Sequence, residues 1–167
     1  MRKVIMILVA IVSLSTGIVY SQHFVGFQQN ITTESYIDLD SVSVNKYAPP
    51  YYIIDVNYGH KLLGQQEIYV IKERFLYDYD HQEVKVSHVA QNHKDKYGNW
   101  SGWVDYAPRE PADVKPGTIG YTLANLAFYK AYHMAFNKEF QVKYANKLEA
   151  YKENKKAPYL LAQVKGQ

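Results

Sequence analysis

A two-residue alternation of apolar and polar side chains is the feature that most constrains the fold of this chain. It begins in "SYIDLDSVSV", where Ile37 and Leu39 alternate with tyrosine and aspartate, and it recurs as far as residue 91. This period is typical of strands with one buried face, because successive side chains of a strand point to opposite faces. The pattern predicts four strands, at residues 35–44, 51–58, 66–79 and 82–91.

Turn-forming residues separate these segments. Pro49 and Pro50 cannot donate to a strand ladder, so they predict a break before the second strand. The stretch "DYDH", residues 78–81, predicts a tight antiparallel hairpin between the third and fourth strands. Further on, Gly98 and Asn99 stand between aromatic residues and predict another hairpin.

The second predicted strand, "YYIIDVNY", has one face that is more apolar than the other. Asp55 falls on the more polar face, so we interpret it as a surface or edge carboxylate. The better-buried face consists of Tyr52, Ile54, Val56 and Tyr58.

The period changes to 3.6 residues after a proline-rich loop, "APREPADVKPG". Thr118 can cap a first helix, and Asn137 is a candidate break and the cap of a second. Pro158 stops the second helix at or before Ala157. The predicted helices are residues 118–136 and 138–156.

The order of these elements, strands first and helices last, favours an α+β fold rather than a βαβ repeat. We predict an antiparallel sheet of about 5–6 strands over residues 35–106, followed by the two helices. Residues 22–34 are expected to be a lead-in or a short edge segment. Together, residues 22–167 are expected to form a single domain.

The first 21 residues have the features of a secretory signal peptide. Arg2 and Lys3 are followed by an apolar run of nine residues, which is short for a membrane span. Cleavage is expected after Ser21, with Gly17 as an alternative and an uncleaved anchor as another. The chain has no cysteine, so it has no disulfide and no thiol for lipid attachment. We therefore expect an exported protein, in the periplasm or at the cell surface, with no stable membrane span after cleavage.

Charge is unevenly distributed along the chain. Residues 22–137 contain ten Lys and Arg against thirteen Asp and Glu, whereas residues 138–167 contain seven Lys against three Glu. The basic tail can meet an anionic surface such as cell-wall polymer, or it can be a solvated helix face. A nucleic-acid ligand is not expected, because the chain has no arginine-rich stripe and no RNA-binding aromatic motif.

Two acidic groups are candidates for metal binding or acid–base chemistry. Asp38 and Asp40 lie on one strand face, about 7 Å apart at a rise near 3.3 Å per residue. The second group falls at a predicted hairpin tip, where solvated charges are common. Turn formation is the favoured interpretation of both groups. The second consists of Asp78, Asp80, His81 and Glu83.

The histidines show neither an HExxH helix nor a paired metal-ligand spacing. His88 and His93 are five residues apart, which matches neither one strand face nor one helix turn. No serine elbow for a catalytic triad is present. We therefore predict no metal, no cofactor and no catalytic residues. The six histidines are His23, His60, His81, His88, His93 and His133.

The strongest candidate for ligand binding is an aromatic set near the predicted hairpin at Gly98. Exposed aromatic rings beside polar residues can stack on sugars or anchor a protein partner. The competing interpretation is that one or both tryptophans cover an edge of the core. The set consists of Tyr97, Trp100, Trp103 and Tyr106.

Several segments together resemble a group of uncharacterised exported bacterial proteins: "YIDLDSVSV", "PPYYIIDVNY", "ERFLYDYDHQEVKV", "YGNW" and "ANLAFYKAYHMAF". Residues 35–110 look like the surface-adhesin protein E type domain. That resemblance implies an envelope or surface protein that binds host or matrix proteins and performs no chemistry. The missing lipid-attachment cysteine is a departure from lipid-anchored members of that type.

We therefore expect an exported, non-enzymatic, adhesin-like binding module, with a host or matrix protein or a cell-envelope polymer as its partner. The alternative is a periplasmic hydrolase or metal-dependent enzyme that uses Asp38 and Asp40 or the group from Asp78 to Glu83.

Overall fold

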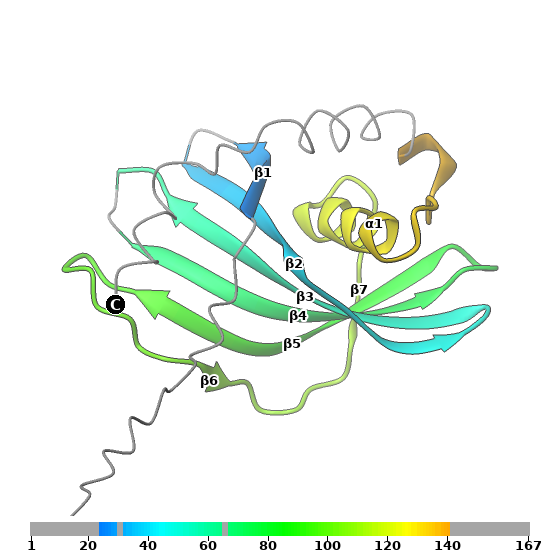
Figure 1. Ribbon diagram of the computed structural model, residues 1–167, viewed down its shortest axis with the longest axis horizontal. Helices are drawn as coiled ribbons and strands as arrows, with labels where there is room; N and C mark the ends of the chain where they lie inside the picture. Colours follow the sequence, from blue (N-terminus) through cyan, green and yellow to red (C-terminus); the bar gives the residue numbers. More distant parts are fainter. Residues whose placement is uncertain (1–23, 30–31, 65–66, 141–167) are drawn as a thin grey trace, which may run out of the picture.

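A computed structural model describes residues 24–29, 32–64 and 67–140. The predicted signal peptide and most of the second predicted helix lie outside these residues. The described chain forms one antiparallel sheet with a helix against one face (Figure 1). The elements are β1 (Phe24–Gln29), β2 (Thr33–Ala48), β3 (Tyr51–Leu62), β4 (Ile68–Asp78), β5 (Glu83–Lys94), β6 (Val104–Asp105), β7 (Ala112–Asp113) and α1 (Ile119–Tyr132).

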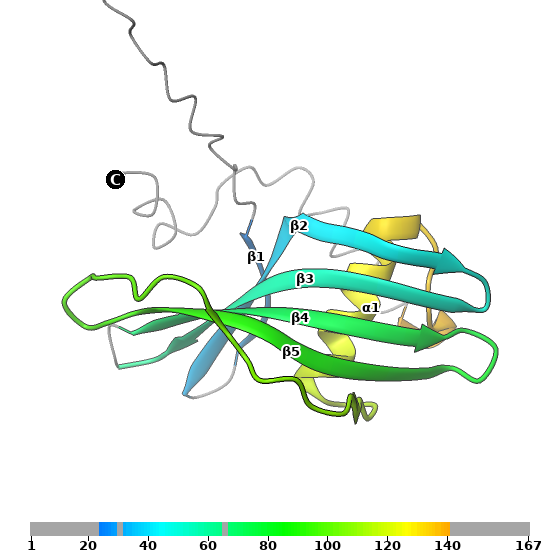
Figure 2. The same cartoon turned by 90° about the horizontal axis from the view of Figure 1, so that it is seen from below.

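The sheet follows the chain in order from β1 to β6, and β7 pairs with β5. Every pairing is antiparallel. From β1 to β5, at most five residues separate each strand from the next, as is usual for antiparallel neighbours. The four predicted strands correspond to β2, β3, β4 and β5, which lie side by side in front of α1 in Figure 2. The predicted fold class, an antiparallel sheet followed by helical structure, is confirmed.

The sheet is more extensive than predicted. Its first strand begins at Phe24, inside the predicted lead-in, and pairs with β2. Its last strand lies in the proline-rich loop, where Ala112 pairs with Val86. Both additions lie at the margins of the sheet, and β6 and β7 have only two residues each. Such short segments have no periodicity of their own to reveal them in the sequence.

The register divides the sheet into two faces. The helix face is the one that contacts α1, and it includes Tyr52 and Ile54 of β3 opposite Tyr77 and Phe75 of β4. The outer face carries the alternate residues. The predicted buried face of the second strand is therefore confirmed, since Tyr52, Ile54 and Val56 are buried and Tyr58 packs against them.

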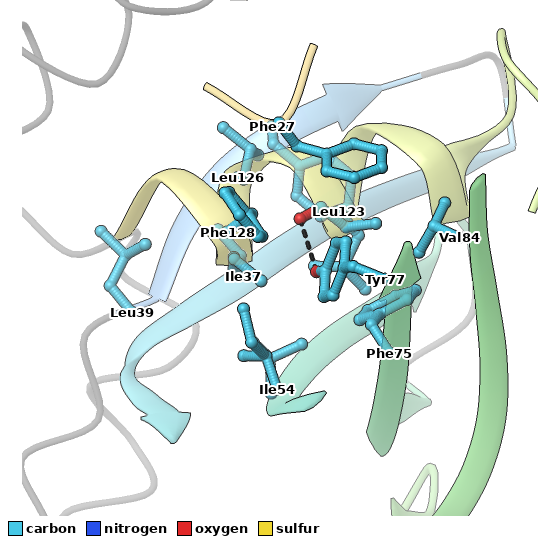
Figure 3. Packing of buried hydrophobic residues seen from close by; sticks show 14 of the residues in the cluster. Phe27, Ile37, Leu39, Ile54, Phe75, Tyr77, Val84, Leu123, Leu126 and Phe128 are labelled. Carbon is cyan, nitrogen blue, oxygen red and sulfur yellow. Dashed lines mark hydrogen bonds between the residues drawn. The ribbon is translucent and has the colours of Figure 1, made fainter. Parts of the chain in front are cut away.

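The core lies between the helix face and α1 (Figure 3). Every residue of α1 from Thr122 to Phe128 is buried, which is typical of a helix enclosed by the protein rather than one lying on its surface. The Tyr77 hydroxyl donates a hydrogen bond to the carbonyl oxygen of Ala124 at 2.8 Å. This bond satisfies a buried phenol and fixes the helix on β4.

Helix α1 begins where the sequence predicts. The Thr118 hydroxyl accepts a hydrogen bond from the backbone N–H of Tyr121 at 3.1 Å, which is an N-cap. The helix ends earlier than predicted, at Tyr132, because His133 adopts a left-handed conformation with φ of 54°. The Asn137 side chain then accepts from the N–H groups of Glu139 and Phe140, which confirms it as a second cap.

The prediction that Asp55 is a surface or edge carboxylate is wrong. Asp55 lies on the outer face but is buried, and Arg74 of β4 donates two hydrogen bonds to its carboxylate, at 2.8 and 2.9 Å. The two residues are direct cross-strand partners. A buried carboxylate needs such a partner, and the bidentate geometry explains why this one can leave the solvent.

Candidate functional site

The segment that holds the predicted aromatic set, residues 95–106, is called here the aromatic loop. It starts with a turn built on Asp95, whose carboxylate accepts from the N–H groups of Tyr97 at 2.8 Å and Asn99 at 2.9 Å. Gly98 has φ of +91°, a conformation that favours glycine. These hydrogen bonds, first of all that from Asn99, lower the pKa of Asp95 below its usual value. The turn is thus held by an ionised carboxylate.

Two of the four predicted residues fix the aromatic loop to the sheet. Trp100 packs against a small apolar cluster that contains Phe24, Ile68 and Val70, and its backbone forms a bridge with Lys94. Tyr106 donates a hydrogen bond through its hydroxyl to Gln91 Oε1 at 2.6 Å, and its backbone N–H donates to the Val89 carbonyl. The position of Trp100 therefore agrees with the interpretation that one of the tryptophans covers an edge of the core.

The other two residues point outward. Tyr97 is 76% exposed and Trp103 is 49% exposed, and Val104 beside Trp103 is 54% exposed. The Lys96 ammonium lies 5.0 Å from the centre of the Tyr97 ring. The structure therefore divides the predicted set into two anchors and two presented rings, and it does not gather all four into one cluster.

A second site, which the sequence did not single out, lies on the helix face beyond the core. His88 Nδ1 of β5 is 2.9 Å from both carboxylate oxygens of Glu73 of β4. The Glu73 side chain is only 5% exposed, whereas that of His88 is 57% exposed. Burial raises the pKa of Glu73 above its usual value, and the adjacent His88 opposes that shift. The carboxylate is thus buried beside the core, with one exposed imidazole as its partner.

The groups around this pair are aromatic and polar. The ring of Tyr106 lies 5.6 Å from that of His88, centre to centre. Tyr58 of β3 occupies the next cross-strand row, and its pKa is raised by burial first, then by the charge of Glu73 and by Tyr106. Tyr106 therefore joins the aromatic loop to the Glu73–His88 pair.

The chemistry of the pair follows from its hydrogen bond. An ionised carboxylate only accepts, so His88 Nδ1 carries the hydrogen, an assignment made from the geometry. In the neutral ring, Nε2 is then an acceptor. A carboxylate that fixes an imidazole in this way supports hydrogen bonding to a ligand, proton transfer or metal ligation. Within residues 24–29, 32–64 and 67–140, no three His, Asp or Glu side chains are grouped to hold a metal ion.

The acidic groups considered in the sequence make local contacts, one at a bulge and the other at a turn. Asp38 is buried and accepts from the backbone N–H of Asp40 at 3.2 Å. It precedes a bulge in β2, where Ser41 donates to the Asp38 carbonyl and accepts from Asn57 N–H. At the β4–β5 tip, Asp78 accepts from the backbone N–H of His81 and contacts its ring at 2.9 Å. The turn interpretation accounts for the contacts of Asp78, but it is wrong for Asp38 and Asp40, because β2 continues through the bulge to Ala48.

The remaining described histidines lie apart from that tip. His60 contacts Ser35 at 3.4 Å, and His93 stacks on Tyr69 with ring centres 4.4 Å apart. Both tie neighbouring strands of the helix face together.

Comparison of the chain with models of protein families, with curated proteins and with solved structures found no match. In the part of the chain that the structure describes, no helix has the length and apolar character needed to cross a membrane.

Proposed function

We propose that this protein is an exported, non-enzymatic binding module that contacts a protein or a cell-envelope polymer through the aromatic loop. One observation carries the proposal: Tyr97 and Trp103 are exposed, while Trp100 and Tyr106 of the same loop are anchored to the sheet. The anchors limit the motion of the presented rings.

A fixed aromatic ring suits binding for energetic reasons. Tyr and Trp provide a large contact area with few rotatable bonds, so less entropy is lost when they bind. Aromatic residues are also enriched among those that dominate the binding energy of protein interfaces. The hydrogen bonds of Asp95 keep the turn in one conformation before any partner arrives. The loop is therefore organised in advance for contact.

The class of partner rests on the sequence. The signal-like first 21 residues support export, and the resemblance to the surface-adhesin protein E type domain supports a host or matrix protein, or an envelope polymer, as the ligand. The acidic groups of the rival enzyme hypothesis are engaged in local contacts, at a bulge in β2 and at the β4–β5 turn, and these contacts do not favour that second function.

Binding to immobilised cell-wall polymer and extracellular-matrix proteins tests the role of the loop. We expect at least one ligand whose affinity falls by about tenfold or more in the Trp103→Ala variant, since loss of a central aromatic contact costs about 2 kcal/mol. Tyr97→Ala is expected to weaken binding as well.

Tyr51→Ala is the matched control. Tyr51 is 52% exposed, close to the value for Trp103, but it lies in the β2–β3 hairpin. Its removal is expected to leave binding unchanged. Equal affinity of Trp103→Ala and wild type for every ligand bound would contradict the proposal, as would a panel with no ligand at all.

Export is tested separately by fractionation of cells that produce the full chain. We expect the protein in the periplasm or the medium, in a form shortened by removal of about 21 residues. Mass spectrometry of the mature N-terminus checks the cleavage site. Recovery of the unshortened chain in the cytoplasm would rule out the exported function.

A further inference from the structure

The basic residues of the sheet are confined to one of its two faces. In the described strands, every lysine and arginine falls on the outer face by register. These residues are Lys46, Lys61, Lys72, Arg74, Lys85 and Lys94. The helix face carries the carboxylate of Glu73 instead, and α1 adds only Lys130, which is exposed in its last turn. The described strands therefore give the helix face the Glu73 carboxylate but no lysine or arginine.

The part of the helix face beyond the core is called here the polar half. Three cross-strand rows build it, and it consists of Tyr58, His60, Tyr69, Glu73, His88, Gln91 and His93. Glu67 adds a second carboxylate at its far end, where Oε2 lies 3.2 Å from the Tyr69 hydroxyl and 4.0 Å from His93 Nε2. Among the described residues, the hydrogen-bond and ion-pair partners of both carboxylates are imidazoles and phenols rather than ammonium or guanidinium groups.

Glu73 has acceptor capacity that its partner does not use. Its two oxygens share a single N–H of His88, although a carboxylate can accept about four hydrogen bonds. A buried acceptor with too few donors is costly, and an ammonium group supplies three donors. His88 is the exposed member of the pair, so a ligand meets the carboxylate beside this ring.

Aromatic rings complete the site. Tyr58 and Tyr106 lie close enough to influence each other electrostatically, and Tyr106 contacts the His88 ring. The face of an aromatic ring attracts a cation, and the attraction is stronger where water is partly excluded. A carboxylate with flanking phenol rings is thus complementary to a basic side chain.

We propose that the polar half of the helix face binds a lysine or arginine side chain from a basic segment of a protein partner. The site is distinct from the exposed rings of the aromatic loop. Ligand binding lost in Trp103→Ala therefore bears on the loop, whereas binding lost through Glu73 bears on the polar half.

Titration calorimetry of the full chain at pH 8 with acetylated tetralysine amide tests this inference. We expect measurable binding, and about tenfold weaker binding of the same peptide with its side-chain amines acetylated. Glu73→Gln is expected to weaken binding by about the same factor. Glu83→Gln makes the same change at an exposed carboxylate of the outer face and is expected to bind like wild type.

A second pair of variants keeps the test decisive if Glu73→Gln does not fold. Tyr58→Phe retains the ring and is expected to bind nearly as wild type, whereas Tyr58→Leu loses it and binds more weakly. The inference fails if the acetylated peptide binds equally well, if no peptide binds, or if Glu73→Gln folds and binds as wild type.

Discussion

Phe128→Ala is expected to lower the free energy of unfolding by about 3–5 kcal/mol, the usual cost of a large-to-small change at a fully buried aromatic residue. Phe128 is completely buried at the centre of an aromatic cluster. Its ring centre lies 5.0 Å from that of Tyr77 and 5.2 Å from that of Tyr52, and it also contacts Phe136. Alanine would leave a cavity between α1 and the sheet. Equilibrium denaturation by urea measures the loss.

Val44→Ala is the control for this substitution. Val44 lies on the helix face of β2 but is 45% exposed, so its truncation is expected to change the free energy of unfolding by less than about 0.5 kcal/mol. A loss below 1 kcal/mol for Phe128→Ala would mean that α1 does not pack on the sheet as described.

His88→Ala is expected to destabilise the protein in a pH-dependent way. At pH 8 the variant must either bury the Glu73 carboxylate without its imidazole partner or keep it protonated, and both cost free energy. Removing one member of a fully buried pair costs about 3–5 kcal/mol, and the exposure of His88 reduces the expectation to about 1–3 kcal/mol. Urea denaturation at pH 4 and pH 8 measures the difference.

The sign of this pH dependence follows from the pKa of Glu73, which burial raises above its ordinary value of 4.5. A carboxyl group of this kind favours folding when protonated, so its contribution is full below about pH 4.5 and is lost as the pH rises through the folded-state pKa. His88 lowers the pKa of Glu73, so removal of His88 reduces the free energy of unfolding most at high pH. The deficit of His88→Ala is therefore expected to be largest at pH 8 and to disappear near pH 4.

The double variant Glu73→Gln with His88→Ala provides the check. It has no buried charge, so it is expected to recover most of the stability lost at pH 8. His81→Ala, at the exposed β4–β5 tip, serves as the control that removes an imidazole outside the helix face. A deficit of His88→Ala that is equal at pH 4 and pH 8 would show that Glu73 is not a buried charge.

The four long central strands could be predicted because a half-buried strand produces a two-residue alternation of apolar and polar side chains in the sequence. Thr118 and Asn137 were equally readable, since the bond that caps a helix is local. The burial of Asp55 could not be predicted, because it depends on Arg74, nineteen residues away on the next strand. The end of α1 was also missed, since apolar residues at helical spacing continue past His133 to Met134 and Ala135, although His133 adopts a left-handed conformation.

The candidate sites differ in how far the sequence could reveal them. The Glu73–His88 pair was accessible in principle: a regular hairpin that pairs Asp78 with Glu83 also pairs Glu73 with His88. Each residue alternates with apolar ones in the sequence, Glu73 with Ile71 and Phe75 and His88 with Val84 and Val86, and an ionisable residue in such a pattern can signal a site. The division of the aromatic loop was not accessible, because the partner of Trp100 is a cluster formed by β1 and β4.

The most direct test of the binding proposal uses the two tryptophans as reporters. Trp100→Phe leaves only the exposed Trp103 to fluoresce, and Trp103→Phe leaves only the anchored Trp100. Titration with a bound matrix protein free of tryptophan, or with cell-wall polymer, is predicted to shift the emission of Trp100→Phe to shorter wavelength and to leave that of Trp103→Phe unchanged. Saturable binding that leaves the Trp103 emission unchanged would contradict the account.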